Sequence, residues 1–313
     1  MKIRSVYIAA LTLLLAASCK PARKVYMFST FREPADQGLY LAYSYDGLNW
    51  ADLGGPWLSP QVGKQKVMRD PSVVRSPDGT FQLVWTSSWR GDPGFGYAHS
   101  KDLIHWSAQK LIPVMAYDTS TINVWAPELF YDQFRNEYII IWASTIPYKF
   151  EKGIEEENNN HRMYYTVTRD FETFSETKLF LDPKFSVIDA VIAERGKDDY
   201  VLVLKDNTRP ERDIKVAFGP TPLGPYEHIS APFTGKFTEG PTLLKKDNAW
   251  YIFYDAYQQK KYGVSRTTDF IHFEDVSSSA HLPEGHKHGT IFEADKPTLK
   301  RLIKESKKRE KDD

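Results

Sequence analysis

Short runs of β-branched, aromatic and aliphatic residues recur along the chain, and turn residues separate them. Five runs have the composition of central β-strands, at residues 25–29, 81–86, 138–143, 200–204 and 250–254. Four of them follow a further short run across turn signals such as Pro-Asp-Gly and Asp-Asn, at residues 72–75, 129–132, 190–194 and 242–245. This pattern predicts antiparallel strands in repeated units.

A turn motif also repeats along the chain. Each copy has a Ser or Thr, an Asp two positions later and an aromatic residue four positions after the Asp. The copies span residues 44–50, 100–106, 168–174 and 267–273. A degenerate copy rich in Pro and Gly, residues 219–226, lies between the last two. Each copy is predicted to join two strands, and the regular recurrence indicates a repeat architecture.

The repeats give four units of four strands and an N-terminal unit of three. Residues 286–292 provide the missing strand. A C-terminal strand added to the N-terminal sheet closes a ring and protects both sheet edges. We therefore predict an all-β, five-bladed β-propeller over residues 25–292, whose N-terminal three-stranded blade is closed by a C-terminal strand. A β-sandwich is the alternative, but it explains neither the repeat spacing nor the missing strand.

The remaining C-terminal residues, 293–313, form a charged tail. Leu299, Leu302 and Ile303 have helical spacing within it, which predicts a short helix that docks on the propeller.

The N-terminus has the layout of a secretory signal. Lys2 and Arg4 precede an apolar run, residues 6–17, which is shorter than the about 20 residues that span a bilayer. Residues 15–19 resemble a bacterial lipoprotein signal, which implies cleavage of residues 1–18 and lipidation of Cys19. Residues 19–24 would then tether the protein to the bacterial cell envelope, periplasmic or surface-exposed. The alternative is an uncleaved anchor or a buried N-terminal helix.

Charge and cysteine content exclude several function classes. The chain has 41 basic and 41 acidic residues, whereas nucleic-acid binders normally carry a basic excess. Its one cysteine cannot form an intrachain disulfide, and no Cys/His cluster has zinc spacing. We expect a monomer with no nucleic-acid partner that contacts the membrane only through its lipid anchor.

One polar residue begins the innermost strand of each predicted blade. These residues are Asp70, Glu128, Asp189, Glu239 and His288. Taken singly, an acid before Pro or Gly usually belongs to a turn. Equivalent positions in a ring converge on one end of the central axis, however, and close carboxyls raise one another's pKa. Such a cluster can supply the acid and the base that glycoside cleavage requires.

The segments around these residues resemble glycoside hydrolase family 43, over residues 24–292. The segment RDPSVVR resembles the family's base motif, which implies that Asp70 is the general base. SVIDAVI resembles the segment of the Asp that tunes the acid's pKa, here Asp189. TEGPTLL resembles the acid motif and implies that Glu239 protonates the leaving group. WAPEL resembles the family's blade-two motif, which implies that Glu128 binds substrate.

The resemblance implies an exo-acting, inverting hydrolase that removes terminal α-L-arabinofuranosyl or β-D-xylosyl groups from plant-type polysaccharides or oligosaccharides. It implies that this hydrolase requires no cofactor. About 50 residues precede the base motif, more than in many relatives, so the blades are permuted and the substrate inference is weakened. The alternatives are a related galactosyl-specific glycosidase, a lipid-anchored carbohydrate-binding propeller without turnover, and a scaffold for protein partners.

Further residues are candidates for substrate binding. Trp89 and Trp125 could stack on sugars, whereas Trp85 and Trp142 alternate within strands and are predicted to pack between blades. The insertion at residues 146–162 could close one side of the cavity and favour an exo-acting pocket, or be a disordered surface loop.

Arg209 and His288 are also candidates for the site, and each has more than one possible role. Arg209 could bind a sugar hydroxyl or a carboxylate, or form a surface ion pair with Glu211 or Asp213. His288 could bind substrate, bond to a carboxylate or ligate an axial cation, and the sequence leaves these open.

Overall fold

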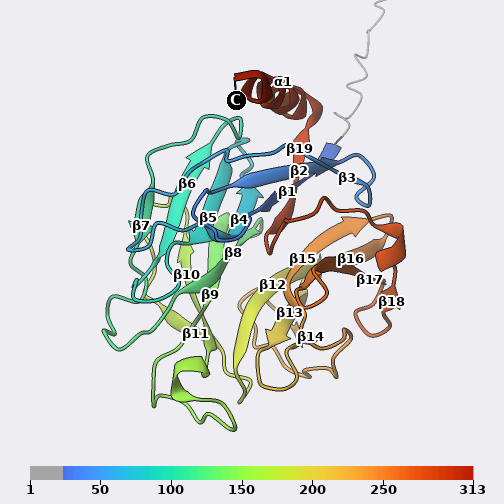
Figure 1. Ribbon diagram of the computed structural model, residues 1–313. Helices are drawn as coiled ribbons and strands as arrows, with labels where there is room; N and C mark the ends of the chain where they lie inside the picture. The colour runs from blue at the N-terminus through green and yellow to red at the C-terminus, as the bar shows by residue number, and fades with distance from the viewer. Residues whose placement is uncertain (1–23, 313) are drawn as a thin grey trace, which may run out of the picture.

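Five antiparallel sheets surround a common centre in the computed structural model, which describes residues 24–312 (Figure 1). Blade I contains β19 (Thr290–Asp295), β1 (Lys24–Thr30), β2 (Tyr40–Ser44) and β3 (Trp50–Asp52). Blade II contains β4 (Arg69–Arg75), β5 (Phe81–Thr86), β6 (Phe95–Ser100) and β7 (Lys110–Ile112). Blade III contains β8 (Trp125–Asp132), β9 (Glu137–Ser144), β10 (Arg162–Thr168) and β11 (Lys178–Leu181). Blade IV contains β12 (Val187–Gly196), β13 (Asp199–Asp206) and β14 (Asp213–Gly219). Blade V contains β15 (Glu239–Lys246), β16 (Ala249–Ala256), β17 (Lys261–Thr267) and β18 (Glu274–Asp275).

The ring is closed as the sequence predicted. β19 pairs antiparallel with β1, from Ser29 opposite Thr290 to Lys24 opposite Asp295. The innermost strands contact one another in the cyclic order β19, β4, β8, β12, β15 and back to β19. The five-bladed propeller with its C-terminal closing strand is therefore confirmed, and the closing strand extends to Asp295.

Blade IV differs from the prediction of four strands. Outside β14, only an isolated bridge between Phe218 and Glu227 replaces the fourth strand. The segment between them contains Pro220, Pro222 and Pro225. Proline has no backbone N–H to donate to a strand ladder, so this segment cannot extend the sheet.

The repeated turn motif has the same hydrogen bonds in its four full copies. In the first copy, the Ser44 hydroxyl accepts the backbone N–H of Gly47 (2.8 Å), and the Asp46 carboxylate accepts those of Leu48 and Asn49 (each 2.8 Å). The Asp102, Asp170 and Asp269 carboxylates accept the corresponding N–H groups in the other copies. The motif thus satisfies turn N–H groups that no strand partner reaches.

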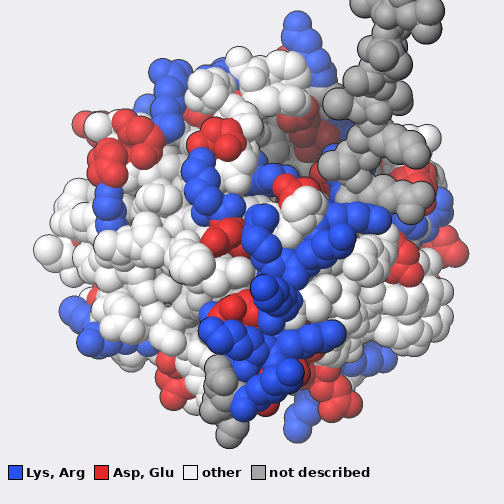
Figure 2. Space-filling view, turned by 90° about the horizontal axis from the view of Figure 1, so that it is seen from above, with Lys and Arg blue, Asp and Glu red and all other residues white. Residues whose placement is uncertain are grey.

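Large apolar side chains fill the space between blades. Trp85 and Trp142 are fully buried, which confirms that they pack between blades. The helix α1 (Lys296–Asp312) follows the closing strand, and its Leu299 and Leu302 side chains are buried in the core between blades I and II. Figure 2 views the side of the molecule above blade I and shows a band of Lys and Arg side chains across it.

The predicted signal peptide, Cys19 and most of the tether lie outside the described residues, so the lipid anchor stays a prediction. Within residues 24–312, none of the helices has the length and hydropathy needed to cross a bilayer.

Candidate active site

The innermost strands of blades II to V share a β-bulge at one end. In blade II, Arg69 pairs with Thr86 and Ser72 with Val84, so two inner residues oppose one on the second strand. The equivalent bulges lie between Trp125 and Glu128, Ile188 and Val191, and Glu239 and Thr242. The first residue inside each bulge has a positive φ: Asp70 (50°), Ala126 (46°), Asp189 (51°) and Gly240 (59°).

These bulges correct the predicted equivalence of the five polar residues. Asp70 and Asp189 occupy the same bulge position, and His288 has the corresponding place two residues before Thr290 in the closing strand. Glu239 lies one residue before this position and Glu128 two residues after it. Because side chains alternate along a strand and a bulge redirects them, residues at the blade period do not all reach the same cavity.

Asp70, Asp189, Glu239 and His288 line one cavity of about 260 Å³ at this end of the axis. The Nδ1 atom of His288 lies 3.1 Å from Oδ1 of Asp70 and 4.0 Å from Oδ1 of Asp189. The Thr86 hydroxyl donates a hydrogen bond to Oδ2 of Asp70 (2.9 Å). The structure thus brings together the three predicted catalytic carboxyls and the axial imidazole.

A buried lysine joins this cluster from the end of β13. Lys205 is 2% exposed, and its ammonium donates a hydrogen bond to Oε2 of Glu239 (2.8 Å). Oδ2 of Asp189 accepts the backbone N–H of Gly240 (3.1 Å). Glu239 and Asp189 lie on adjacent inner strands and have different partners. Glu239 bonds to a full positive charge, whereas Asp189 bonds to a neutral backbone N–H group.

Unlike partners give the three carboxyls different pKa values. Burial alone would raise the pKa of each. For Asp70, hydrogen bonding and charge from His288 outweigh burial and lower the pKa. For Glu239, the adjacent Lys205 also outweighs burial and lowers the pKa. For Asp189, burial prevails over His288 and Lys205, and the pKa is raised.

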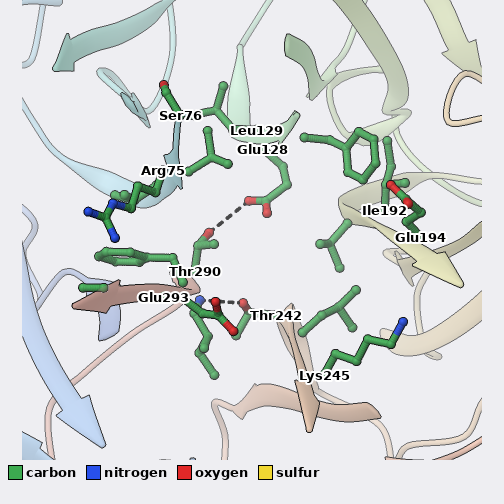
Figure 3. A pocket seen from close by; sticks show the side chains of 18 of the residues that line it. Arg75, Ser76, Glu128, Leu129, Ile192, Glu194, Thr242, Lys245, Thr290 and Glu293 are labelled. Carbon is green, nitrogen blue, oxygen red and sulfur yellow. Dashed lines mark hydrogen bonds between the residues drawn. The ribbon is translucent and has the colours of Figure 1, made fainter. Parts of the chain in front are cut away.

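Glu128 lies in another cavity, of about 800 Å³, which does not include the predicted catalytic carboxyls (Figure 3). Its Oε2 atom accepts a hydrogen bond from the Thr290 hydroxyl (3.1 Å), among the apolar side chains of Leu129 and Ile192. Burial raises the pKa of Glu128 to about 7. The expectation that Glu128 lies beside the predicted catalytic residues is wrong in its placement, because Glu128 directly follows the bulge, two positions after Ala126.

Trp89 and Trp125, the tryptophans predicted to stack on sugars, both line the cavity of Asp70, Asp189 and Glu239. The rings of Trp89 and Trp125 lie 4.7 Å apart between centroids, and the Trp125 indole N–H donates to the Trp89 carbonyl (2.7 Å). His161 stacks on the other side of Trp125 at 4.9 Å. Trp89 is 46% exposed, and the Arg69 guanidinium lies over its ring at 4.8 Å from the centroid, so a ligand can reach the exposed part of the indole.

The insertion after β9 reaches the cavity through Asn159, in the short 3₁₀ helix η1 (Glu157–Asn159). The Ser186 hydroxyl donates to the Asn159 carbonyl (2.5 Å), and buried Arg162 donates to the Asn160 side chain (2.7 Å). The segment is thus fixed to the propeller, contrary to the alternative of a disordered loop.

Arg209 is not among the residues that line the cavity. Its guanidinium lies 3.4 Å from Glu155 and 3.8 Å from Glu156, both in the insertion. The predicted bond of Arg209 to a carboxylate of the cavity is therefore wrong, and so are the alternative partners Glu211 and Asp213, whereas a contact with a sugar hydroxyl stays a prediction. Folding of the insertion over blade IV brings this distant pair together.

Other polar residues that line the cavity were not among the individual site residues predicted from the sequence. These are Arg69, Thr86, Asn159, Lys205, Asn207, Arg212 and Tyr257. The sequence did contain a signal for Lys205, because this residue directly follows the apolar run of β13. In the structure Lys205 pairs with Ile188 just before the bulge of blade IV, as Thr86 pairs with Arg69 just before the bulge of blade II.

A bound cation is not favoured beside His288. Within residues 24–312, no group of three or more His, Cys, Asp or Glu side chains is arranged as a metal site. Burial lowers the pKa of His288, but Asp189 and Asp70 outweigh this and raise it to about 9. The resulting imidazolium has no lone pair for a cation at neutral pH.

The His288 pKa predicts a decline of stability in mild alkali. A folded-state pKa of about 9 lies above the unfolded value of 6.5, so the contribution is complete below pH 6.5 and is lost as the pH rises through 9. We expect the free energy of unfolding to fall by about 2–3 kcal/mol over this window. Urea denaturation at successive pH values measures it.

The variant His288→Gln should abolish this decline, and His228→Gln, at an exposed histidine, should retain it. Glu128 contributes a separate decline between pH 4.5 and about 7, because its folded-state pKa is also raised. An alkaline decline unchanged in His288→Gln would contradict the assignment.

Comparisons with known proteins agree with this geometry. Residues 22–297 match a family model related to glycoside hydrolase family 43 and described as a probable glycosyl hydrolase domain. An α-L-arabinofuranosidase of Bifidobacterium longum subsp. longum is 26% identical over 172 residues, 47% of this chain and 15% of that protein. The chain thus spans a small part of this curated relative's length.

Solved structures share the fold. A thermostable family-43 glycoside hydrolase has a TM-score of 0.56 and 16% identity, over 71% of this chain and 78% of that chain. The family-43 endo-arabinanase of Bacillus licheniformis has a TM-score of 0.51 and 16% identity, over 69% of this chain and 79% of that chain.

Proposed function

Because the chain belongs to the glycosyl hydrolase domain family related to glycoside hydrolase family 43, we propose that it is an exo-acting, inverting glycosidase. Its proposed substrates are terminal α-L-arabinofuranosyl or β-D-xylosyl groups of plant-type polysaccharides or oligosaccharides. The observation that carries the proposal is the convergence of Asp70, Asp189 and Glu239, from three blades, in one cavity with an aromatic wall.

Asp70 is proposed as the general base. Its lowered pKa keeps the carboxylate ionised at neutral pH, so it can accept a proton from a water molecule that attacks the anomeric carbon. His288 and Thr86 each bond to one of its oxygens and fix its orientation.

Glu239 is proposed as the general acid and Asp189 as the group that tunes it. An acid must carry a proton, whereas Lys205 favours the ionised form of Glu239 in the empty cavity. Asp189 has the raised pKa and lies close enough to Glu239 for each to influence the other's ionisation. We propose that the two carboxyls hold one proton between them and that Glu239 delivers it to the leaving oxygen.

An exo mode of action is consistent with the size of the cavity. Its volume of about 260 Å³ suits a single sugar ring, and Asn159 of the insertion borders it. The indole of Trp89 is available to stack on that ring.

A screen of 4-nitrophenyl glycosides, with arabinofuranoside, xyloside and galactoside substrates, tests the proposal. We expect turnover of a pentoside, a product first formed with inverted anomeric configuration by proton NMR, and a kcat about 10²–10⁴-fold lower in Asp70→Asn. Undiminished turnover in Asp70→Asn, or a retained configuration, would contradict the mechanism.

One observation favours a second candidate, a carbohydrate-binding propeller without turnover. The Lys205 ammonium neutralises the proposed acid. Sugar binding by calorimetry, with no hydrolysis of any glycoside in the screen, would select this candidate.

A further inference from the structure

Among the residues that the structure describes, one arginine that lines the cavity forms no ion pair. Each other cation that lines it has an acidic partner: Arg69 with Glu33 (2.8 Å), Lys205 with Glu239 (2.8 Å) and His288 with Asp70 (3.1 Å). Arg212 also lines the cavity, and within residues 24–312 it forms no ion pair. The remaining acid of the lining, Asp189, lies 4.0 Å from His288 and forms no ion pair with Arg212, so the Arg212 guanidinium is available to an anionic ligand.

Buried donors without partners lie at the same place. Nε of Arg212 is buried and has no hydrogen-bond partner among the described residues, and the same is true of the Tyr257 hydroxyl, which lines the same cavity. Buried polar groups are normally hydrogen-bonded, so orphaned donors beside an open cavity indicate a missing acceptor. The amides of Asn159 and Asn207, nearby in the lining, carry no charge that could neutralise Arg212.

The backbone supports this placement of Arg212. Its φ of 49° is in the left-handed region, which is sparsely populated by residues other than Gly, Asn and Asp. The Arg212 N–H donates to the Thr208 carbonyl (3.2 Å), and the Arg212 carbonyl accepts from the Thr238 N–H (3.1 Å). Arg212 is thereby fixed between the end of β13 and the start of β15, the strand that begins with Glu239.

We infer that Arg212 binds a sugar carboxylate, so that the substrate of this site contains a uronic acid. Guanidinium binds carboxylate through two parallel N–H···O bonds, whereas a neutral sugar would leave the Arg212 guanidinium without an ion-pair partner. The inference rests on the proposed glycosidase function and narrows its substrate class. The carboxylate belongs either to the cleaved sugar or to the sugar attached to it.

Direct binding tests the inference without any turnover. Calorimetry should show that D-galacturonate or D-glucuronate binds the full chain at least 10-fold more tightly than its methyl ester, which has the same ring and no charge. The preference should fall as NaCl rises from 0.05 to 0.5 M. Arg212→Gln should abolish the preference, Arg212→Lys should keep part of it, and Arg266→Gln, at an exposed ion pair on blade V, should leave it unchanged.

Turnover then distinguishes the two sources of the carboxylate. Faster cleavage of a pentosyl group linked to a free uronic acid than to its methyl ester identifies the attached sugar, whereas cleavage of a 4-nitrophenyl uronide identifies the cleaved sugar. Equal binding of acid and ester, or a preference retained in folded Arg212→Gln, would overturn the inference. If the protein hydrolyses neutral pentosides but binds acid and ester equally, the proposed glycosidase function is supported and only the uronic-acid inference is refuted. If it binds uronate through Arg212 but hydrolyses no glycoside, only the proposed function is refuted.

Discussion

Glu239→Gln is expected to lower kcat/KM by about 10²–10⁴-fold on oligosaccharides, with a much smaller loss on aryl glycosides that have good leaving groups. Gln keeps the shape of Glu239 but has no proton to donate. A nitrophenolate leaves without protonation, whereas a sugar alkoxide needs the acid. The measurement is the slope of log kcat/KM against the pKa of the leaving group, which should steepen in the variant.

Two comparisons make this result specific to the acid. Glu227→Gln, at an exposed position of blade IV, should leave both rate and slope unchanged. Asp70→Asn should lower the rate with little change of slope, because a base acts on water and not on the leaving group. If the slope steepens in Asp189→Asn and not in Glu239→Gln, Asp189, whose pKa is raised, is the acid instead.

The propeller could be predicted because its repeats are local. Each turn motif carries its own hydrogen bonds, such as those of Ser44 and Asp46, and each strand run carries its own apolar pattern. The closing strand followed from simple counting, since one blade lacked a strand. The prolines between β14 and the isolated bridge were visible in the sequence too, and their missing N–H groups explain why blade IV has three strands.

The site was less predictable because the blade period does not fix which way a side chain points. Glu128 lies at the blade period but directly after the bulge, two positions from the place that Asp70 has in its own blade, and it lines a different cavity from Asp70. A bulge adds one residue to a strand and so changes the direction of the side chains around it. A polar residue before Pro or Gly does not show in the sequence whether it lies before, inside or after such a bulge. Asp70 and Asp189 were placed correctly because both occupy the bulge itself.

Ion-pair partners were harder still to predict. Neighbours in sequence suggested Glu211 or Asp213 for Arg209, but its partners come from an insertion about 50 residues earlier. Lys205 bonds to Glu239, on the next blade. Such pairs depend on how loops fold across blades, which no local pattern encodes.

Lys205→Met is expected to destabilise the protein by about 3–5 kcal/mol at pH 7, because it leaves the partly buried Glu239 carboxylate without its counter-charge. Methionine has a similar length and no charge, so the loss is mainly electrostatic. Lys215→Met is the matched control, since Lys215 pairs with Asp206 (2.7 Å) on an adjacent strand, away from the cavity lining. Urea denaturation of both variants at pH 7 gives the comparison.

The pH dependence separates the effect on Glu239 from a general loss of packing. With Lys205 present, the pKa of Glu239 is lowered, so its stabilising contribution exists above about pH 4.5 and is lost as the pH falls through the folded-state value. Without Lys205, burial raises the pKa of Glu239 above 4.5, and stability then falls as the pH rises through the new value. The stability difference between wild type and Lys205→Met should therefore grow from pH 4 to pH 7.

The alkaline limb of kcat/KM should move to higher pH in Lys205→Met and stay in place in Lys215→Met, because only Lys205 contacts the proposed acid. A stability difference independent of pH, or an alkaline limb that does not move, would show that Lys205 supports packing and does not set the ionisation of Glu239.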